Sequence, residues 1–260
     1  MQVVFCVIMF MIGACIGSFL CCQVRRMRLG ETKKNEKLGK WSVCLKCGHK
    51  LKWYENIPIV SWIGLRGKCK KCKKRIGYLE IFSEVATGIV MALIGSMIDV
   101  DKVGLLDWLA FVGLVLFTSS LIFLAIYDGM YGELPVGILI LAAVLAVVYA
   151  VLKVVQGELV PVEAVISAAI LGGLYLVLYL ISKGKWVGDG DWILAGIIGL
   201  AIGQPFFALV ALFVSNFSAC VIMWPYVHKS KNHKIYFGPF LVFGFILALI
   251  ISNYVIINLW

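Results

Sequence analysis

Apolar stretches of membrane-spanning length recur along this chain, and they constrain its fold more than any other feature. Of its 260 residues, 62% are hydrophobic and 15% are charged, and the mean hydropathy is +0.98. A helix that crosses the hydrocarbon core of a bilayer needs about 20 mainly apolar residues in a row. The sequence therefore predicts an all-α polytopic membrane protein.

Eight apolar runs are candidates for transmembrane helices. They lie at residues 3–22, 81–98, 108–127, 134–152, 162–181, 192–202, 206–224 and 238–257. The sixth is short for a full crossing. The first is predicted to be a span rather than a signal peptide, because its basic cluster follows the apolar run instead of preceding it. We expect three parts: the first transmembrane helix (1–22), a cytoplasmic loop (23–79) and a membrane domain (80–260).

The basic residues predict the orientation, because Lys and Arg collect on the cytoplasmic side of membrane proteins. With the N-terminus outside, 22 of the 24 basic residues fall on that side: 17 lie between Arg25 and Arg75, and the others are Lys183, Lys185, Lys229, Lys231 and Lys234. The net charge of +10 is therefore interpreted mainly as a topology signal. It also suits contact with anionic lipids, and no nucleic-acid partner is expected.

The loop after the first span contains two Cys-x-x-Cys pairs. Cys44 and Cys47 form the first, and Cys69 and Cys72 form the second after a gap of 21 residues. Two such pairs can surround one zinc ion tetrahedrally. Disulfides are the alternative, but the loop is assigned to the reducing cytosol. Because four thiolates leave no open position, we expect a structural zinc that holds together a zinc-ribbon-like hairpin with little core of its own.

Two glycines and one histidine accompany these cysteines. Gly48 and Gly67 stand where tight turns around each pair favour a permissive backbone. His49 adjoins the first pair but is surplus to a four-thiolate site. We therefore expect the glycines to shape the hairpin and do not expect His49 to bind the metal.

Two aspartates, Asp128 and Asp191, stand at the ends of apolar runs, and the second closes the sequence Gly188-Asp189-Gly190-Asp191. In the predicted topology both face the cytoplasm. Asp128 ends one helix and Asp191 starts another, so the helix dipole disfavours charge on the first and favours it on the second. Two carboxyl groups with such different settings can supply the acid and the base of an aspartic protease.

Each of these acidic residues also has a structural interpretation. Asp191 can simply cap the sixth helix, and Asp128 can end the third in water. Asp189 competes with Asp191, although it lies before the helix and between two glycines that suit close backbone approach. Glu84 falls within the second span and therefore needs a partner or a polar cavity.

Small residues in the spans allow two further interpretations. Gly13 and Gly17 in the first span, and Gly196, Gly199 and Gly203 in or beside the sixth, can let neighbouring helices pack closely or can admit a guest helix. Close packing of the chain's own helices is the simpler expectation.

Taken together, these motifs resemble the type IV prepilin peptidases, membrane aspartic proteases with a Gly-x-Gly-Asp motif. The resemblance runs nearly end to end. It comprises Gly13, Gly17, Ser18, Phe19 and Leu20; the four cysteines; Glu55-Asn56-Ile57-Pro58, Ser61-Trp62 and Gly67-Lys68-Cys69; Glu84, Thr87 and Gly88; Asp128 seven residues before Pro135; Gly188, Gly190 and Asp191; and Phe237-Gly238-Pro239-Phe240.

The resemblance implies a substrate and a site. It implies an aspartic endopeptidase of the cell (inner or plasma) membrane that cuts the short basic leader from type IV prepilins or pseudopilins at the cytoplasmic face. Asp128 and Asp191 would be the catalytic pair, with Gly188 and Gly190 as supporting backbone. Many members also methylate the new N-terminus with S-adenosylmethionine. No residues for that cofactor, and no oligomeric state, follow from the sequence.

The chain also departs from the family pattern at several positions. In place of residues that are common there, it has Cys21, Arg28, Leu45, Leu79-Glu80-Ile81, Val136 and, two places after the second aspartate, Ile193 instead of lysine. The changes in the first span weaken the case for methylation more than the case for cleavage. The aspartate pair is intact.

The mechanism expected from the sequence is activation of water between two carboxyl groups. Asp191, ionised, takes a proton from the water, while protonated Asp128 stabilises the oxyanion. The roles can also be exchanged, since coupled carboxylates titrate as a pair. The alternatives are a proton-coupled transporter that uses the same aspartates and a non-catalytic scaffold that binds pilus-assembly partners through its zinc hairpin.

Overall fold

The computed structural model describes residues 1–32, 42–44, 46–184, 187–227 and 236–259. Of the positions discussed above, Leu45, Lys185, Lys229, Lys231 and Lys234 lie outside the described residues. The chain forms two compact units, Met1–Ser96 and Met97–Trp260. Both are helical, which confirms the predicted all-α class, and the described part of the chain contains only isolated β-bridges besides its helices.

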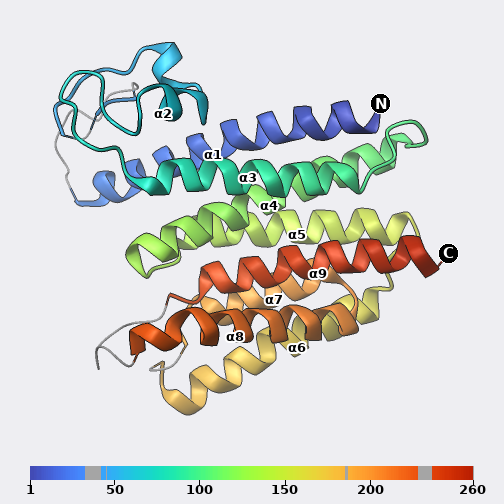
Figure 1. Ribbon diagram of the computed structural model, residues 1–260. Coiled ribbons are helices and arrows are strands. Elements are labelled where there is room, and N and C mark those ends of the chain that lie inside the picture. The colour runs from blue at the N-terminus through green and yellow to red at the C-terminus, as the bar shows by residue number, and fades with distance from the viewer. Residues whose placement is uncertain (33–41, 45, 185–186, 228–235, 260) are drawn as a thin grey trace. The chain divides into compact units, whose positions relative to one another are not determined.

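The first unit consists of two long helices and the cysteine-containing loop between them (Figure 1). Helix α1 spans Gln2–Thr32 and α3 spans Tyr78–Ser96. The loop carries a short 3-10 helix, η1 (Trp53–Asn56), and one turn of α-helix, α2 (Val60–Gly64). The hairpin predicted between the first two spans is therefore present.

Two glycines of α1 bring it against α3. A Cβ atom on Gly13 would lie 2.7 Å from the carbonyl oxygen of Thr87, and one on Gly17 would lie 2.5 Å from that of Ser83. Larger side chains are excluded because both contacts are with backbone atoms. Of the two interpretations of these glycines, the structure supports close packing of the chain's own helices.

The loop is tied to α3 through Glu84. This side chain is buried, and its Oε2 accepts a hydrogen bond of 2.7 Å from the backbone N–H of Ile59. Ile59 has φ 63° and ψ −55°, a conformation that is strained for a β-branched residue. Glu84 therefore has the partner that an acidic residue in a span requires, and it holds a strained turn in place.

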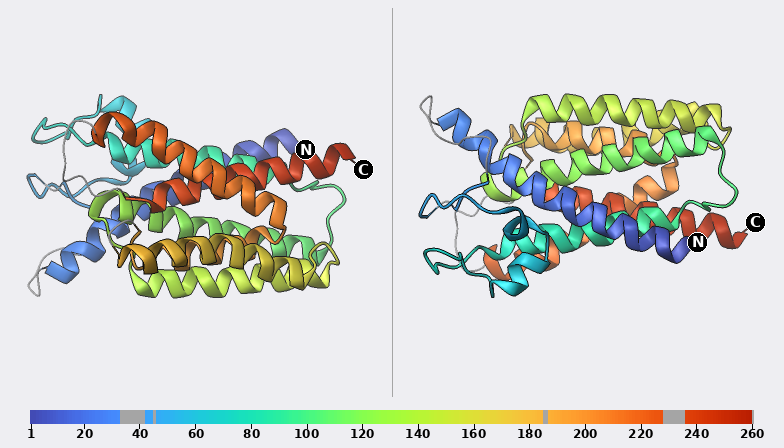
Figure 2. Two further views of the ribbon diagram at one scale, coloured as in Figure 1. Left: turned by 90° about the horizontal axis from the view of Figure 1, so that it is seen from below. Right: turned by 90° about the horizontal axis from the view of Figure 1, so that it is seen from above.

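The second unit contains the other six helices, which run side by side (Figures 1 and 2). They are α4 (Leu105–Tyr131), α5 (Val136–Val155), α6 (Pro161–Ser182), α7 (Asp191–Ile202), α8 (Pro205–Val227) and α9 (Gly238–Leu259). Helix α7 contacts α5, α6, α8 and α9, so it lies inside the unit. Small residues again allow two helices, α6 and α7, to approach closely, since a Cβ atom on Gly172 would lie 2.9 Å from the Cα atom of Gly196.

Seven helices among the described residues are long and apolar enough to cross a membrane, one fewer than the eight expected spans. The exception is α7, the sixth predicted run, which has 12 residues. At 1.5 Å per residue it is about 18 Å long, against a hydrocarbon core of about 30 Å. The prediction of about eight transmembrane helices is thus refined to seven long helices and one short apolar helix enclosed by its neighbours.

Candidate active site and metal centre

Asp128 lies in the last turn of α4 and is 5% exposed. The helix ends because Gly132 takes a left-handed conformation (φ 68°) and donates its N–H to the carbonyl oxygen of Asp128 at 2.7 Å. The carboxyl group is thereby placed at the carboxyl end of a helix, where the dipole does not favour negative charge.

Asp191 is the first residue of α7 and is 7% exposed. Its Oδ2 accepts a hydrogen bond of 3.0 Å from the backbone N–H of Gly188. Gly188 and Gly190 of the motif allow neighbouring side chains to approach the backbone closely, and neither glycine has a positive φ. A Cβ atom on Gly188 would lie 3.1 Å from the Asp191 carboxylate, and one on Gly190 would lie 2.8 Å from Cδ1 of Leu134.

The start of α9 supplies the matching contact to Asp128. The backbone N–H of Gly238 donates to its Oδ2 at 2.8 Å, across 110 residues of sequence. This N–H is free for the contact because the first N–H groups of a helix have no partner within the helix. A Cβ atom on Gly238 would lie 2.8 Å from the same oxygen, so the contact requires glycine.

The structure brings the two predicted aspartates together within the second unit. The end of α4 and the starts of α7 and α9 gather at one end of this helix group (Figure 1). Gly190, the residue before Asp191, packs against Leu134 in the segment that follows α4, so the Gly-x-Gly-Asp motif lies next to the end of the helix that carries Asp128. Asp189, by contrast, is exposed and forms a hydrogen bond with Tyr179. Of the two motif aspartates, Asp191 alone is buried beside Asp128.

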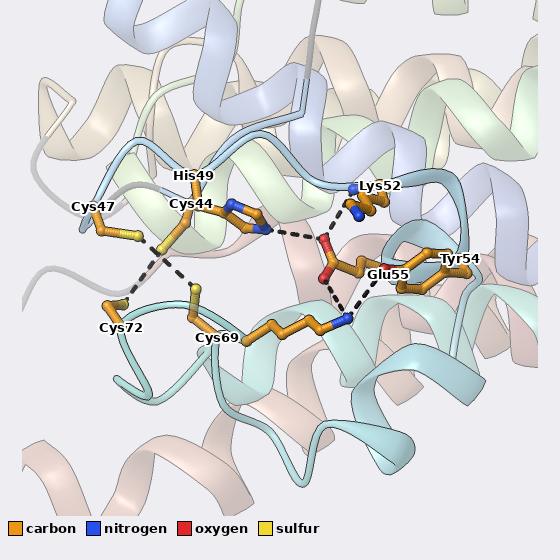
Figure 3. A network of polar contacts seen from close by, with 9 residues as sticks. Cys44, Cys47, His49, Lys52, Tyr54, Glu55, Cys69 and Cys72 are labelled. Carbon is orange, nitrogen blue, oxygen red and sulfur yellow. Dashed lines mark hydrogen bonds and ion pairs between the residues drawn. The ribbon is translucent and has the colours of Figure 1, made fainter.

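In the first unit, the four predicted cysteines converge. Their Sγ atoms all lie within 4.8 Å of one another, and those of Cys44 and Cys72, and of Cys47 and Cys69, are 3.9 Å apart (Figure 3). Four sulfur atoms at about 2.3 Å around a tetrahedral zinc ion lie about 3.8 Å from each other. The four thiols therefore fit one zinc ion in both chemistry and spacing.

Matching turns shape the two cysteine pairs. The N–H of Gly48 donates to the carbonyl oxygen of Cys44 at 2.8 Å, and that of Lys73 donates to Cys69 at 3.0 Å. Gly48 has φ 67°, Lys73 has φ 57° and Gly67 has φ 63°. The predicted turn positions Gly48 and Gly67 are thus confirmed. Backbone N–H groups of Cys72 and Lys71 lower the pKa of the Cys69 thiol to about 6.

A buried carboxylate joins the two cysteine pairs. Oε2 of Glu55 accepts the backbone N–H of Lys52 at 2.9 Å and lies 3.2 Å from Nε2 of His49, which follows the first pair (Figure 3). Its Oε1 lies 4.0 Å from Nζ of Lys70, inside the second pair. The Lys52 N–H, with further help from His49, lowers the pKa of Glu55. His49 therefore supports the hairpin through Glu55.

Two family profiles match the chain. The profile described as Bacterial Peptidase A24 N-terminal domain matches residues 11–98, and the profile described as Type IV leader peptidase family matches residues 115–226. The chain belongs to the type IV prepilin peptidase family. This confirms the resemblance found in its motifs, and it agrees with the membrane helices and the four-cysteine cluster.

Curated relatives of this family member are named prepilin leader peptidase/N-methyltransferase. The relative from Vibrio cholerae is 26% identical over 263 residues, which cover 95% of this chain and 97% of the relative. The one from Neisseria gonorrhoeae is 29% identical over 223 residues, covering 83% and 70%. The one from Myxococcus xanthus is 38% identical over 86 residues, and this match spans only 33% of the chain and 24% of the relative. No solved structure matches.

Three contacts in this prepilin peptidase family member could not be predicted from its sequence. They are the Gly238 N–H bond to Asp128, the Glu55 link between the cysteine pairs, and the hydrogen bond between Asn216 and the buried Tyr175. The run Phe237-Gly238-Pro239 carries a signal for the first contact, because a proline next to a glycine before an apolar run marks a helix start with free N–H groups. Ile193, at the usual lysine position, is 37% exposed.

Proposed function

We propose that this protein is an aspartic endopeptidase that removes the basic leader from type IV prepilins or pseudopilins. The observation that carries the proposal is the pairing of two buried carboxyl groups, Asp128 and Asp191, from helix ends of opposite polarity. Membership of the prepilin peptidase family supports it, as do the names of the relatives. The N-terminus would lie outside and the site would face the cytoplasm, consistent with the basic residues.

In the proposed reaction, water held between the carboxyl groups attacks the carbonyl carbon of the scissile amide. Asp191 takes one proton from the water, and Asp128 donates a hydrogen bond to the developing oxyanion. As the C–N bond breaks, Asp191 gives this proton to the leaving amine, so Asp191 is again ionised and Asp128 again protonated. Each carboxyl group is positioned by one backbone N–H, from Gly238 for Asp128 and from Gly188 for Asp191.

We further propose that segment 23–79 is a cytoplasmic loop held by one structural zinc ion on Cys44, Cys47, Cys69 and Cys72, and that 80–260 carries the peptidase chemistry. The convergent thiols support the metal. S-adenosylmethionine would be the second cofactor if the chain also has the methyltransferase activity in its relatives' names. Anionic lipids are the expected surroundings of the basic loop.

The decisive experiment incubates the purified protein, in lipid nanodiscs, with a prepilin and measures the product by mass spectrometry. Loss of the leader is expected, and addition of S-adenosylmethionine tests for a further shift of one methyl group. Proton-coupled transport and a purely scaffolding role both predict an intact prepilin. An intact prepilin, under conditions in which a characterised relative cleaves it, would contradict the proposed activity.

Replacing Gly238 with alanine is expected to reduce cleavage by about 10- to 100-fold, because the new methyl group must displace the Asp128 carboxylate or the start of α9. The measurement is kcat/KM for leader removal. Gly113→Ala in α4 is the matched control, since a Cβ atom there meets nothing within 4 Å. Equal activity of the two variants would show that the Gly238 contact does not position the carboxyl group.

A further inference from the structure

Tyr175 is a buried polar residue of the second unit that the proposed mechanism does not yet use. It lies in α6 and is 2% exposed. Its phenolic oxygen accepts a hydrogen bond of 2.9 Å from Nδ2 of Asn216 in α8. Burial of a hydroxyl group in a membrane helix is costly unless it is hydrogen-bonded, so Asn216 gives Tyr175 one of its partners.

The second contact of Asn216 fixes the direction of this hydrogen bond. Nδ2 of Asn216 also donates to the backbone carbonyl oxygen of Leu212 at 2.8 Å. A carbonyl oxygen only accepts hydrogen bonds, so the NH₂ group of the amide must face it. Both amide hydrogens are then used, one on Leu212 and one on Tyr175. Because the phenolic oxygen is the acceptor, the hydrogen of Tyr175 remains to be donated elsewhere.

The packing of Tyr175 places it near the two aspartates. Its ring packs against the ring of Phe237, with centroids 5.2 Å apart, and the next residue is Gly238, whose N–H binds Asp128. Three residues before Tyr175 on α6, a Cβ atom on Gly172 would lie 3.3 Å from the carbonyl oxygen of Trp192, the residue after Asp191. Tyr175 thus touches the segment that positions one carboxyl group, and it lies one turn of α6 from the contact with the residue that follows the other.

We propose that Tyr175, oriented by Asn216, donates its phenolic hydrogen towards the carboxylate of Asp191 and so keeps Asp191 the proton acceptor of the pair. The role in peptide cleavage rests on the proposed function, but the effect on Asp191 does not. Tyr175 is a positioning residue in this proposal, because it acts on the reaction through Asp191.

The proposal explains how two chemically identical groups become different. Each carboxyl group receives one backbone N–H, so these bonds alone do not distinguish them. The dipole of α7 and the Tyr175 donor both favour charge on Asp191. Asp128 from α4, Asp191 from α7 and Tyr175 from α6 are ionisable groups of this site, and the exposed Asp189 precedes α7. Helices α8 and α9 bring Asn216 and the Gly238 N–H, which do not titrate near neutral pH.

The test compares Tyr175→Phe with Tyr179→Phe, one turn further along α6, whose hydroxyl forms a hydrogen bond with exposed Asp189 instead. Loss of a donor to a charged carboxylate should lower kcat about 10-fold and move the acidic limb of the pH–activity profile up by about one pH unit. Tyr179→Phe should leave the profile unchanged. Asn216→Ala should move it in the same direction by a smaller amount, and adding it to Tyr175→Phe should cause little further change.

A second measurement does not depend on peptide cleavage. Infrared titration of the protein in nanodiscs follows the carboxyl band that is lost in Asp191→Asn, and in Tyr175→Phe this band should appear at higher pH. The same titration of Asn216→Ala covers the case in which Tyr175→Phe does not fold. Unchanged titration of Asp191 in the folded variants would overturn the proposal, even if the protein cleaves prepilin. A shifted titration without any prepilin cleavage would uphold the proposal for Asp191 and reject the proposed function.

Discussion

Asparagine in place of Asp128 or Asp191 is expected to abolish leader cleavage, with a loss on the order of 10⁴-fold in kcat for either variant. Each variant removes one of the two groups that must exchange protons with water and the peptide. An asparagine side chain has nearly the same shape, and its oxygen can still accept the N–H of Gly238 or Gly188. The measurement is single-turnover cleavage of a prepilin at saturating enzyme.

The chain offers a closely matched control for this result. Asp189 lies two residues from Asp191 but is exposed and paired with Tyr179, so Asp189→Asn should retain most of the activity. The double variant at Asp128 and Asp191 should be no slower than either single variant, because groups that act as one unit are not additive. Substantial cleavage by either folded single variant would reject the two-carboxylate mechanism, whatever the behaviour of Asp189→Asn.

The sequence predicts a helix wherever apolar residues continue far enough to span a bilayer. It does not predict the residues at which those helices end. The first predicted span covers residues 3–22, but α1 continues to Thr32 through Arg25 and Arg26. Composition marks the part of a helix that lies in lipid, whereas the backbone can remain helical beyond it. For the same reason α4 continues three residues beyond Asp128, where the sequence predicts the end of the third helix, and ends at Tyr131.

Local spacing also explains which parts of the two sites could be predicted. Each cysteine pair occupies a single turn, and turns of this kind are visible in the sequence. Asp191 and its partner Gly188 are likewise three residues apart. The contacts of Asp128 with Gly238 and of Tyr175 with Asn216 join residues 110 and 41 positions apart. Such contacts depend on how helices pack, which a single sequence does not encode in a recognisable pattern.

Glu84 and Glu55 show the same limit in the first unit. The sequence indicates that Glu84 needs a partner, because a carboxylate within a span is costly. It does not indicate that the partner is the backbone N–H of Ile59 in a strained turn. Likewise His49 can be excluded as a fifth ligand by counting thiols, but its contact with Glu55 depends on the folded hairpin. The sequence shows that such residues need a polar partner. Only the folded structure shows which group that partner is.

Removal of the metal is expected to unfold the cysteine hairpin while leaving the long helices intact. Apart from the convergent thiols, the hairpin is held by a few backbone bonds and the Glu55 contacts, and it has little apolar core. Zinc binding in small domains supplies about 10–16 kcal/mol, so its loss should expose the loop almost completely. Trypsin measures this directly, because the loop between residues 46 and 75 is rich in Lys and Arg.

Cys69→Ser is therefore expected to lower bound zinc from one ion per chain to nearly none and to speed tryptic cleavage of the loop by at least about 100-fold, since the protease then acts on an open segment. Cys220→Ser is the matched control, because this thiol lies exposed on α8 in the other unit. It should keep both the zinc and the protease resistance. A hairpin that resists trypsin equally with and without zinc would show that the Glu55 network, rather than the metal, holds the two cysteine pairs together.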